Sequence, residues 1–185
     1  SAAHASQLDE GLIFDQEDAL LSGRSISIFR GRDFSSTAEI DVLYGYPEMP
    51  VLDVTTGEWT SERNNLDEDP IWGAPGFNNL LNNYTWTMEV YDERLWVGTM
   101  DVGGLLAYGT GALTSELGGV EGAIVEVLST TVVGADLWFF VDADVPALPE
   151  VLNGAGNPAN YGFRTMATDG ERLFVGTANP MNLLT

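Results

Sequence analysis

One short stretch occurs twice in this chain, and it constrains the fold more than any other feature of the sequence. Residues 87–99 read TMEVYDERLWVGT, and residues 165–177 read TMATDGERLFVGT. At a constant offset of 78 residues, the two stretches are identical at eight of thirteen positions. An Asn-Tyr pair precedes each copy, at residues 83–84 and 160–161. A repeated unit predicts a fold assembled from similar units that pack against one another.

Each copy has the pattern of a β-hairpin. Strand-forming residues are followed by a polar break, at residues 92–93 in the first copy and 169–171 in the second. A Leu-aromatic-Val run comes next and ends at Gly-Thr. The second break contains Asp-Gly, a strong hairpin signal because both residues tolerate positive φ; the first lacks the glycine, which leaves its turn type open. A hairpin cannot bury its apolar faces alone, so we expect stacked or radially packed neighbours.

The two motifs, YDERLWVGT and TDGERLFVGT, resemble the blade motif of secreted bacterial β-propellers. Residues 134–138, followed by 157–162, are similar to the outer strand and inter-blade linker of such repeats, and the D-x-x-T-G-x-W pattern at 53–59 resembles their outer-strand turn. The resemblance covers about residues 45–180. It implies an all-β fold of antiparallel, propeller-like blades and a secreted, periplasmic or cell-surface location. It implies no particular activity, because propellers include binding proteins and enzymes.

The expected organisation is an acidic N-terminal arm over residues 1–22 and a propeller-like β domain over 23–185. Its blade units are expected at about 23–83, 84–160 and 161–185, the last one incomplete. The repeat interval of 78 residues exceeds the about 40–50 residues of common propeller repeats, so an apolar, glycine-rich insertion is assigned to about 102–132. Closed propellers contain about four to eight blades, so we expect this one to be partial or completed by further chain.

Further strands are predicted from apolar patterning, at residues 25–30, 40–44, 51–54 and 137–141. A long polar loop is expected over residues 61–83. No apolar run approaches the about 18–20 residues that cross a bilayer, so no membrane span is predicted.

Acidic residues dominate the charge. The chain has 28 Asp and Glu against seven basic residues, and its net charge is −21. All seven basic residues are arginine. Such a surface repels nucleic acid, which is therefore not expected as a partner. Two interpretations of the acidity remain open: solubility in a salty or extracellular setting, which we favour, and recruitment of divalent cations such as calcium.

Three aspartates are candidate metal ligands. Asp142 and Asp144 have an alternate spacing that lets both carboxylates reach one cation, but the later oxygen ligands of an EF-hand loop do not follow. Asp101 follows the first Gly-Thr, and Asn179 holds the same place in the second copy. A polar turn is the favoured alternative for the first pair and turn capping for Asp101. Calcium is a possible cofactor, and no cofactor is certain.

Signs of catalysis are scarce. The single histidine is His4, and no Gly-x-Ser-x-Gly, phosphate-loop or His-Glu-x-x-His motif occurs. Glu89 is the candidate catalytic residue, because it is expected on the innermost strand of its blade and its counterpart is Ala167.

The predicted function is a non-catalytic binding or scaffold module. Its expected partner is a protein, or a second copy, bound through the insertion at 102–132 and an open sheet edge. The alternative is a calcium-dependent propeller hydrolase or lyase with a carboxylate-lined channel.

Overall fold

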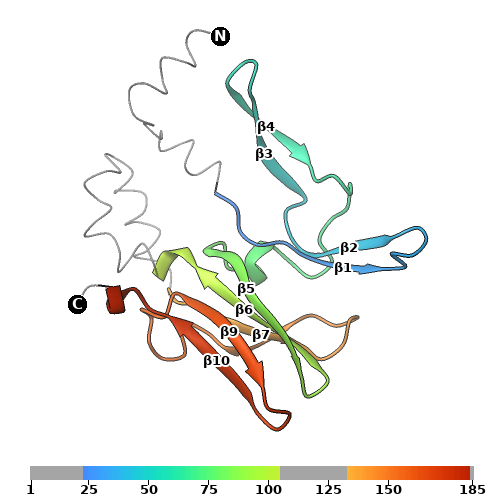
Figure 1. Ribbon diagram of the computed structural model, residues 1–185. Helices are drawn as coiled ribbons and strands as arrows, with labels where there is room; N and C mark the ends of the chain where they lie inside the picture. The colour runs from blue at the N-terminus through green and yellow to red at the C-terminus, as the bar shows by residue number, and fades with distance from the viewer. Residues whose placement is uncertain (1–22, 105–132, 184–185) are drawn as a thin grey trace.

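The computed structural model describes residues 23–104 and 133–183 (Figure 1). The arm expected at residues 1–22, and most of the insertion expected at 102–132, lie outside the described residues. The described chain is built mainly of antiparallel β-strands, so the all-β prediction is confirmed. None of its helices is long and apolar enough to cross a membrane.

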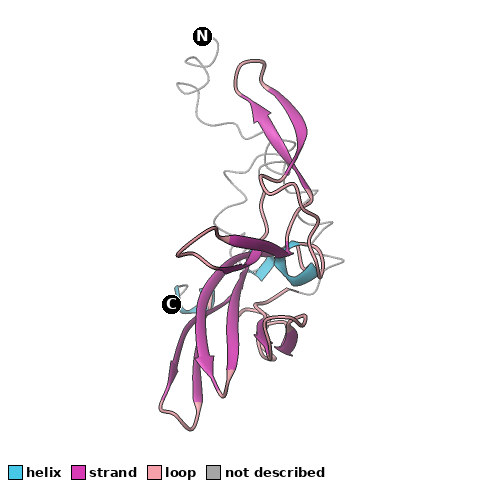
Figure 2. Cartoon of the chain, turned by 90° about the vertical axis from the view of Figure 1, so that its right-hand side faces the viewer, coloured by secondary structure: helices cyan, strands magenta, loops and turns pink. Residues whose placement is uncertain are grey.

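Ten strands and two 3-10 helices follow one another along the described residues. The strands are β1 (Ile28–Arg32), β2 (Glu39–Tyr44), β3 (Glu48–Asp53), β4 (Glu58–Arg63), β5 (Asn82–Tyr91), β6 (Arg94–Asp101), β7 (Leu137–Phe140), β8 (Leu148–Val151), β9 (Gly162–Thr168) and β10 (Leu173–Ala178). The 3-10 helices are η1 (Pro75–Asn78) and η2 (Pro180–Leu183). The β3–β4 hairpin extends away from the larger sheet (Figures 1 and 2).

The largest sheet contains a meander of four strands, each beside the one before it. β5 pairs with β6, β6 with β7, and β7 with β8, and every pair is antiparallel. The β9–β10 hairpin joins this sheet through one pair, Met100 of β6 with Gly162 of β9. Two further hairpins, β1–β2 and β3–β4, form separate two-stranded sheets. The described strands do not close into a propeller.

The two copies of the repeated stretch form the two predicted hairpins, β5–β6 and β9–β10. Asp92 and Glu93 join β5 to β6 with positive φ values of 51° and 59°. Two consecutive residues with positive φ are typical of a type I′ turn, so this turn forms without glycine. Residues 169–172 join β9 to β10. There Gly170 has a φ of 92°, and the Asp169 carboxylate accepts the backbone N–H of both residues after the glycine.

The hairpins β1–β2 and β7–β8 share a register irregularity at the same place. In β1–β2 the register shifts between Ile28 and Phe29, the first two residues of the leading strand. In β7–β8 the register shifts between Leu137 and Trp138, again the first two residues of the leading strand. Thus β1–β2 matches the second half of the meander, as β9–β10 matches the first half.

The loop before each repeated hairpin has a Gly-x-x-Asn-x-x-Asn spacing. Its members are Gly76, Asn79 and Asn82 in the first loop, and Gly154, Asn157 and Asn160 in the second. In each loop the last asparagine side chain donates a hydrogen bond of 2.9 Å to the glycine carbonyl. The glycines have φ values of 69° and 73°, which favour glycine. The counterpart of Asn160 is therefore Asn82, and not Asn83 as the repeated Asn-Tyr pairs suggest.

Each of these loops also binds the segment that leads into β1 or β7. The N–H of Gly76 donates to the carbonyl of Ile26 at 2.8 Å, and the N–H of Ile26 donates to the carbonyl of Asn82 at 2.9 Å. Ala135 makes the same two bonds, at 2.8 and 2.9 Å, with the glycine and the last asparagine of the second loop. Ile26 and Ala135 therefore occupy equivalent places relative to the two loops.

Both faces of the meander are covered by neighbouring parts of the chain. One face packs against β1–β2 and η1, in a core that contains Val97, Trp138, Phe140, Ile28, Tyr44 and Phe77. The other face packs against β9–β10, in a core that contains Trp96, Leu137, Phe139, Phe163, Met166 and Val175. Successive residues of β6 and β7 thus point to opposite cores, which is the alternation expected of strands buried on both sides.

Two sequence-based boundaries need correction. The strands expected at residues 40–44, 51–54 and 137–141 correspond to β2, β3 and β7. The strand expected at 25–30 begins only at Ile28, because the residues before it hydrogen-bond to the loop that precedes β5. The loop expected at 61–83 is shorter, because β4 continues to Arg63 and η1 interrupts the remainder.

Candidate functional site

The structure separates Glu89 from Asp101. Glu89 is half-buried on β5, opposite Trp96 of β6. Asp101 ends β6 and pairs with Asn82 at the other end of the same hairpin. At about 3.3 Å per residue, the seven residue steps from Asn82 to Glu89 span about 23 Å. Glu89 and Asp101 therefore do not share a site.

Asp142 and Asp144 occupy the expected turn after β7, and both are exposed. The N–H of Asp144 donates to the Asp142 carboxylate at 2.8 Å. The Asp144 carboxylate pairs with Arg30 of β1 at 2.5 Å, and Arg30 also pairs with Asp41 at 2.6 Å. These contacts connect the turn to the β1–β2 hairpin.

The three candidate metal ligands are not gathered into one site. Within residues 23–104 and 133–183, no group of three or more His, Cys, Asp or Glu side chains is placed to hold a metal ion. Calcium binding therefore stays a prediction, with no ligand set among these residues.

Two carboxylates are buried close together at one end of the meander. Asp101 is fully buried, and Asp136, which precedes β7, is 3% exposed. The amide of Asn79 bridges them, since its Nδ2 lies 3.3 Å from Asp101 Oδ2 and 3.3 Å from Asp136 Oδ2. Backbone N–H groups add a bond to each carboxylate, from Gly104 to Asp101 at 2.9 Å and from Asn153 to Asp136 at 3.1 Å.

The surroundings of Asp101 change its acidity. Burial raises the pKa of Asp101 above its usual 3.8, because desolvation disfavours the charged carboxylate. The neighbouring Asp136 carboxylate also raises this pKa. The hydrogen bonds from Gly104 and Asn79 stabilise the charged form and oppose the rise.

Asn82 and Thr99 complete the network, and both are fully buried. Asn82 Nδ2 donates to the Asp136 carboxylate at 2.9 Å, and Asn82 Oδ1 accepts the Thr99 hydroxyl at 2.9 Å. The Thr99 hydroxyl accepts the backbone N–H of Asp136 at 2.9 Å. The network connects the start of β5, the end of β6, the entry to β7 and the loop after β8. Its groups are buried and paired, so the geometry favours the capping role for Asp101 over a role in ligand binding.

Asn179 takes the place of Asp101 in the second repeated hairpin. Its Oδ1 accepts the N–H of Met181 at 2.9 Å, so it caps the following turn as Asp101 does. Its Nδ2 donates to Asn160 Oδ1 at 3.0 Å. The described residues supply no counterpart of Asp136 to this hairpin, because no strand corresponding to β7 pairs with β10 there.

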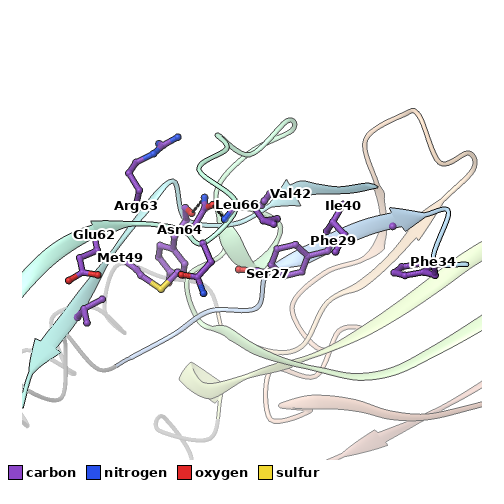
Figure 3. Close-up of a pocket in the computed structure, with 14 residues that line it drawn as sticks. Ser27, Phe29, Phe34, Ile40, Val42, Met49, Glu62, Arg63, Asn64 and Leu66 are labelled. Carbon is purple, nitrogen blue, oxygen red and sulfur yellow. Dashed lines mark hydrogen bonds between the residues drawn. The ribbon is translucent and has the colours of Figure 1, made fainter. Parts of the chain in front are cut away.

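A surface cavity of about 530 Å³ lies between the β1–β2 and β3–β4 hairpins (Figure 3). Its apolar lining consists of Phe29, Phe34, Ile40, Val42, Met49, Val51 and Leu66. Phe29 is 55% exposed and Phe34 is 73% exposed. Exposed aromatic side chains around a hollow, with a partly exposed methionine such as Met49, are typical of surfaces that bind proteins.

Polar contacts at the cavity rim hold its wall in place. Arg63 pairs with Asp67 at 3.0 Å and with Asp69 at 2.7 Å. Asn64 fixes the loop after β4, because its Nδ2 donates to the carbonyl of Tyr46 at 3.0 Å and its Oδ1 accepts a backbone N–H within the loop. These contacts fix the loop after β4 beside the cavity.

The sequence predicts a site role for Asp101, but for no other member of the buried network and for none of the cavity residues. The Gly-x-x-Asn-x-x-Asn spacing occurs before both hairpins and is the signal that could have located the network. The cavity has no comparable signal, because its residues come from two hairpins whose packing depends on their tertiary contacts.

A scan against models of protein families found no match for this chain, and searches of curated proteins and of solved structures found none either.

Proposed function

We propose that this chain is a non-catalytic binding or scaffold module with a propeller-like architecture. The order hairpin, meander, hairpin supports the architecture, since the outer hairpins repeat the two halves of the meander and cover its two faces. Four-stranded blades packed face to face are the building units of propellers. In this proposal β5–β8 is a whole blade, and β1–β2 and β9–β10 are halves of its neighbours. A secreted, periplasmic or cell-surface location belongs to the same proposal.

The observation that carries the binding role is the apolar cavity between β1–β2 and β3–β4. Its aromatic and methionine lining fits an apolar side chain of a protein partner better than a polar metabolite. Glu62, Asp67 and Asp69 outnumber Arg63, which pairs with both aspartates, so the net charge of these four residues is negative and favours a partner with basic residues around that apolar anchor. We therefore expect binding of a protein surface with an apolar centre and a basic border.

A neutral solvatochromic dye such as Nile red tests whether the cavity accepts an apolar group. We expect saturable binding that Val51→Asp weakens about tenfold, equivalent to about 1.4 kcal/mol, because Val51 lines the cavity. Val54→Asp is the matched control, since Val54 is 86% exposed in the same hairpin and does not line the cavity. Fluorescence titration measures both. Non-saturable binding, or equal weakening by the two substitutions, would contradict the proposal.

A further inference from the structure

β10 and β1 each have one edge without a partner strand among the described residues. β10 pairs only with β9, and β1 pairs only with β2. The corresponding strands inside the meander pair with each other: β6, the counterpart of β10, lies beside β7, the counterpart of β1. Among the described residues, β10 and β1 therefore each have a free edge that corresponds to a paired edge inside the meander.

Equivalent residues differ in exposure where a neighbour is missing. Trp96 of β6 is 8% exposed because β9–β10 covers it, whereas its counterpart Phe174 of β10 is 53% exposed. Trp138 of β7 is half-buried and stacks on Phe77 with ring centroids 4.8 Å apart. Its counterpart Phe29 of β1 is 55% exposed. Each outer hairpin therefore has an uncovered face whose counterpart is covered within the chain.

The end of β10 also differs from the end of β6 in a hydrogen bond to the neighbouring strand. The N–H of Thr99 donates to the carbonyl of Asp136 at 3.0 Å, which links the end of β6 to the entry of β7. Thr177, the counterpart of Thr99, is exposed. Ser27 is the counterpart of Asp136, because Ile26 and Ala135 make the same loop contacts. A bond equivalent to that between Thr99 and Asp136 would join the N–H of Thr177 to the carbonyl of Ser27.

We propose that the free edge of β10 in one copy pairs with the free edge of β1 in a second copy. The strands β9–β10 of the first copy and β1–β2 of the second then form a four-stranded meander like β5–β8. Transfer of the internal register makes Val175 the antiparallel partner of Phe29, and the Thr177 N–H donates to the carbonyl of Ser27. This inference goes beyond the proposed function, because it concerns sheet edges and names the partner as a second copy. Phe29 also lines the cavity, so the Phe29 variants are assayed for association and not for dye binding.

The pairing joins two different surfaces, so it is a head-to-tail contact that closes into a ring or grows into a filament. The described strands of each copy supply one whole meander and two halves, so a ring built from these strands contains two blades for each copy. Since propellers have about four to eight blades, a closed ring contains about two to four copies. The charge of −21 on each copy opposes the contact, and salt therefore favours it.

Light scattering of the chain at rising protein concentration, in low and high salt, tests the proposal. We expect a mass above that of a monomer, and a greater mass in high salt. Thr177→Pro removes the N–H at the β10 edge, and Phe29→Pro disrupts the β1 edge, so each variant alone is expected to be a monomer. Thr177→Ser and Phe29→Tyr keep the backbone N–H and are expected to associate like the unmodified chain. Circular dichroism verifies that the proline variants are folded.

A mixture of the two proline variants provides the sharpest test. Thr177→Pro keeps the β1 edge and Phe29→Pro keeps the β10 edge, so together they are expected to form a one-to-one pair that grows no further. An unmodified chain that stays monomeric at every concentration and salt level overturns the proposal. So does association that neither proline variant reduces, or a mixture that does not pair. A monomer whose dye binding still depends on Val51 would leave the proposed cavity function intact.

Discussion

At the scale of single residues, Asp101 and Asp136 place two carboxylates together in a part of the fold closed to water. Moving a charge out of water costs several kcal/mol, and a second charge beside it adds to that cost. Asn79 reduces both costs, because its one amide donates to the two carboxylates. The polar residues around Asp101 and Asp136 are thus needed to stabilise the two carboxylates rather than to bind a ligand.

The raised pKa of Asp101 predicts how stability depends on pH. Between the usual value of 3.8 and the raised value, the folded chain holds the Asp101 proton more tightly than the unfolded chain does. This contribution to stability is fully present below the unfolded-state pKa and is lost as pH rises through the folded-state pKa. Asp101→Asn has no such proton. Its free energy of unfolding, relative to the unmodified chain, should therefore increase as pH rises.

Urea unfolding of both proteins, from about pH 4 to about pH 7, measures this difference. The substitution also alters hydrogen bonds, which adds a constant to the difference in free energy of unfolding. The prediction is therefore tested by whether this difference increases or decreases with pH. A difference that stays flat or decreases with pH would show that burial does not raise the pKa of Asp101.

At the scale of elements, the repeated hairpins share a glycine in different surroundings. A Cβ on Gly98 would lie 2.8 Å from both the Cβ and the carbonyl oxygen of Phe163, so β6 and β9 approach closely there. A Cβ on Gly176 would meet the hydroxyl of Thr165, its cross-strand partner, and next an atom of the same side chain 3.7 Å away. The first obstacle is backbone and core, whereas the second is one atom of an exposed side chain, which a change of the Thr165 rotamer can move away.

Alanine at the two glycines should therefore have unequal effects. We expect Gly98→Ala to lower the free energy of unfolding by about 1–3 kcal/mol, because β9 must move away. Gly176→Ala is expected to cost less than about 1 kcal/mol. Any intrinsic gain from replacing a strand glycine is common to both, so their difference isolates the packing between hairpins. Urea unfolding measures both variants, and equal losses would contradict the close approach of β6 to β9.

The hairpins could be predicted from sequence because their residues recur at a fixed offset. β1–β2 and β7–β8 could not be related in the same way, since IFRGR and LWFF share little. What they have in common is a register shift and a set of main-chain hydrogen bonds, which many different side chains permit. Asp101 can be predicted as a site residue because it follows a repeated Gly-Thr. The cavity cannot, because it depends on how two separate hairpins pack.

At the scale of the whole molecule, charge repulsion opposes the compact state. Only seven arginines offset 28 acidic residues. Four of them, Arg30, Arg32, Arg63 and Arg172, form ion pairs with acidic residues in the described part of the chain, which are Asp41, Asp144, Glu39, Asp67, Asp69 and Asp169. Most carboxylates therefore repel one another across the surface. Salt shortens the range of that repulsion from about 10 Å at 0.1 M to about 3 Å at 1 M.

Stability should therefore increase with sodium chloride. We expect the urea midpoint of unfolding to be higher in about 1 M salt than in about 0.1 M salt, because repulsion is screened. Calcium and magnesium chlorides at matched ionic strength are the controls. Equal shifts with the two divalent ions are expected from screening, whereas a larger shift with calcium alone would favour a specific calcium site.

The β3–β4 hairpin leaves and rejoins the repeating part of the chain at one point, because the N–H of Asn64 donates to the carbonyl of Pro47 at 3.0 Å. The second unit has no such hairpin, and its chain passes from β8 to the asparagine loop within a few residues. A segment whose ends meet can be lengthened, exchanged or removed while the strands on either side keep their register. Evolution can therefore change this hairpin, and the cavity wall that it supplies, independently of the scaffold. The same junction is a place where a protein engineer can graft a new recognition loop.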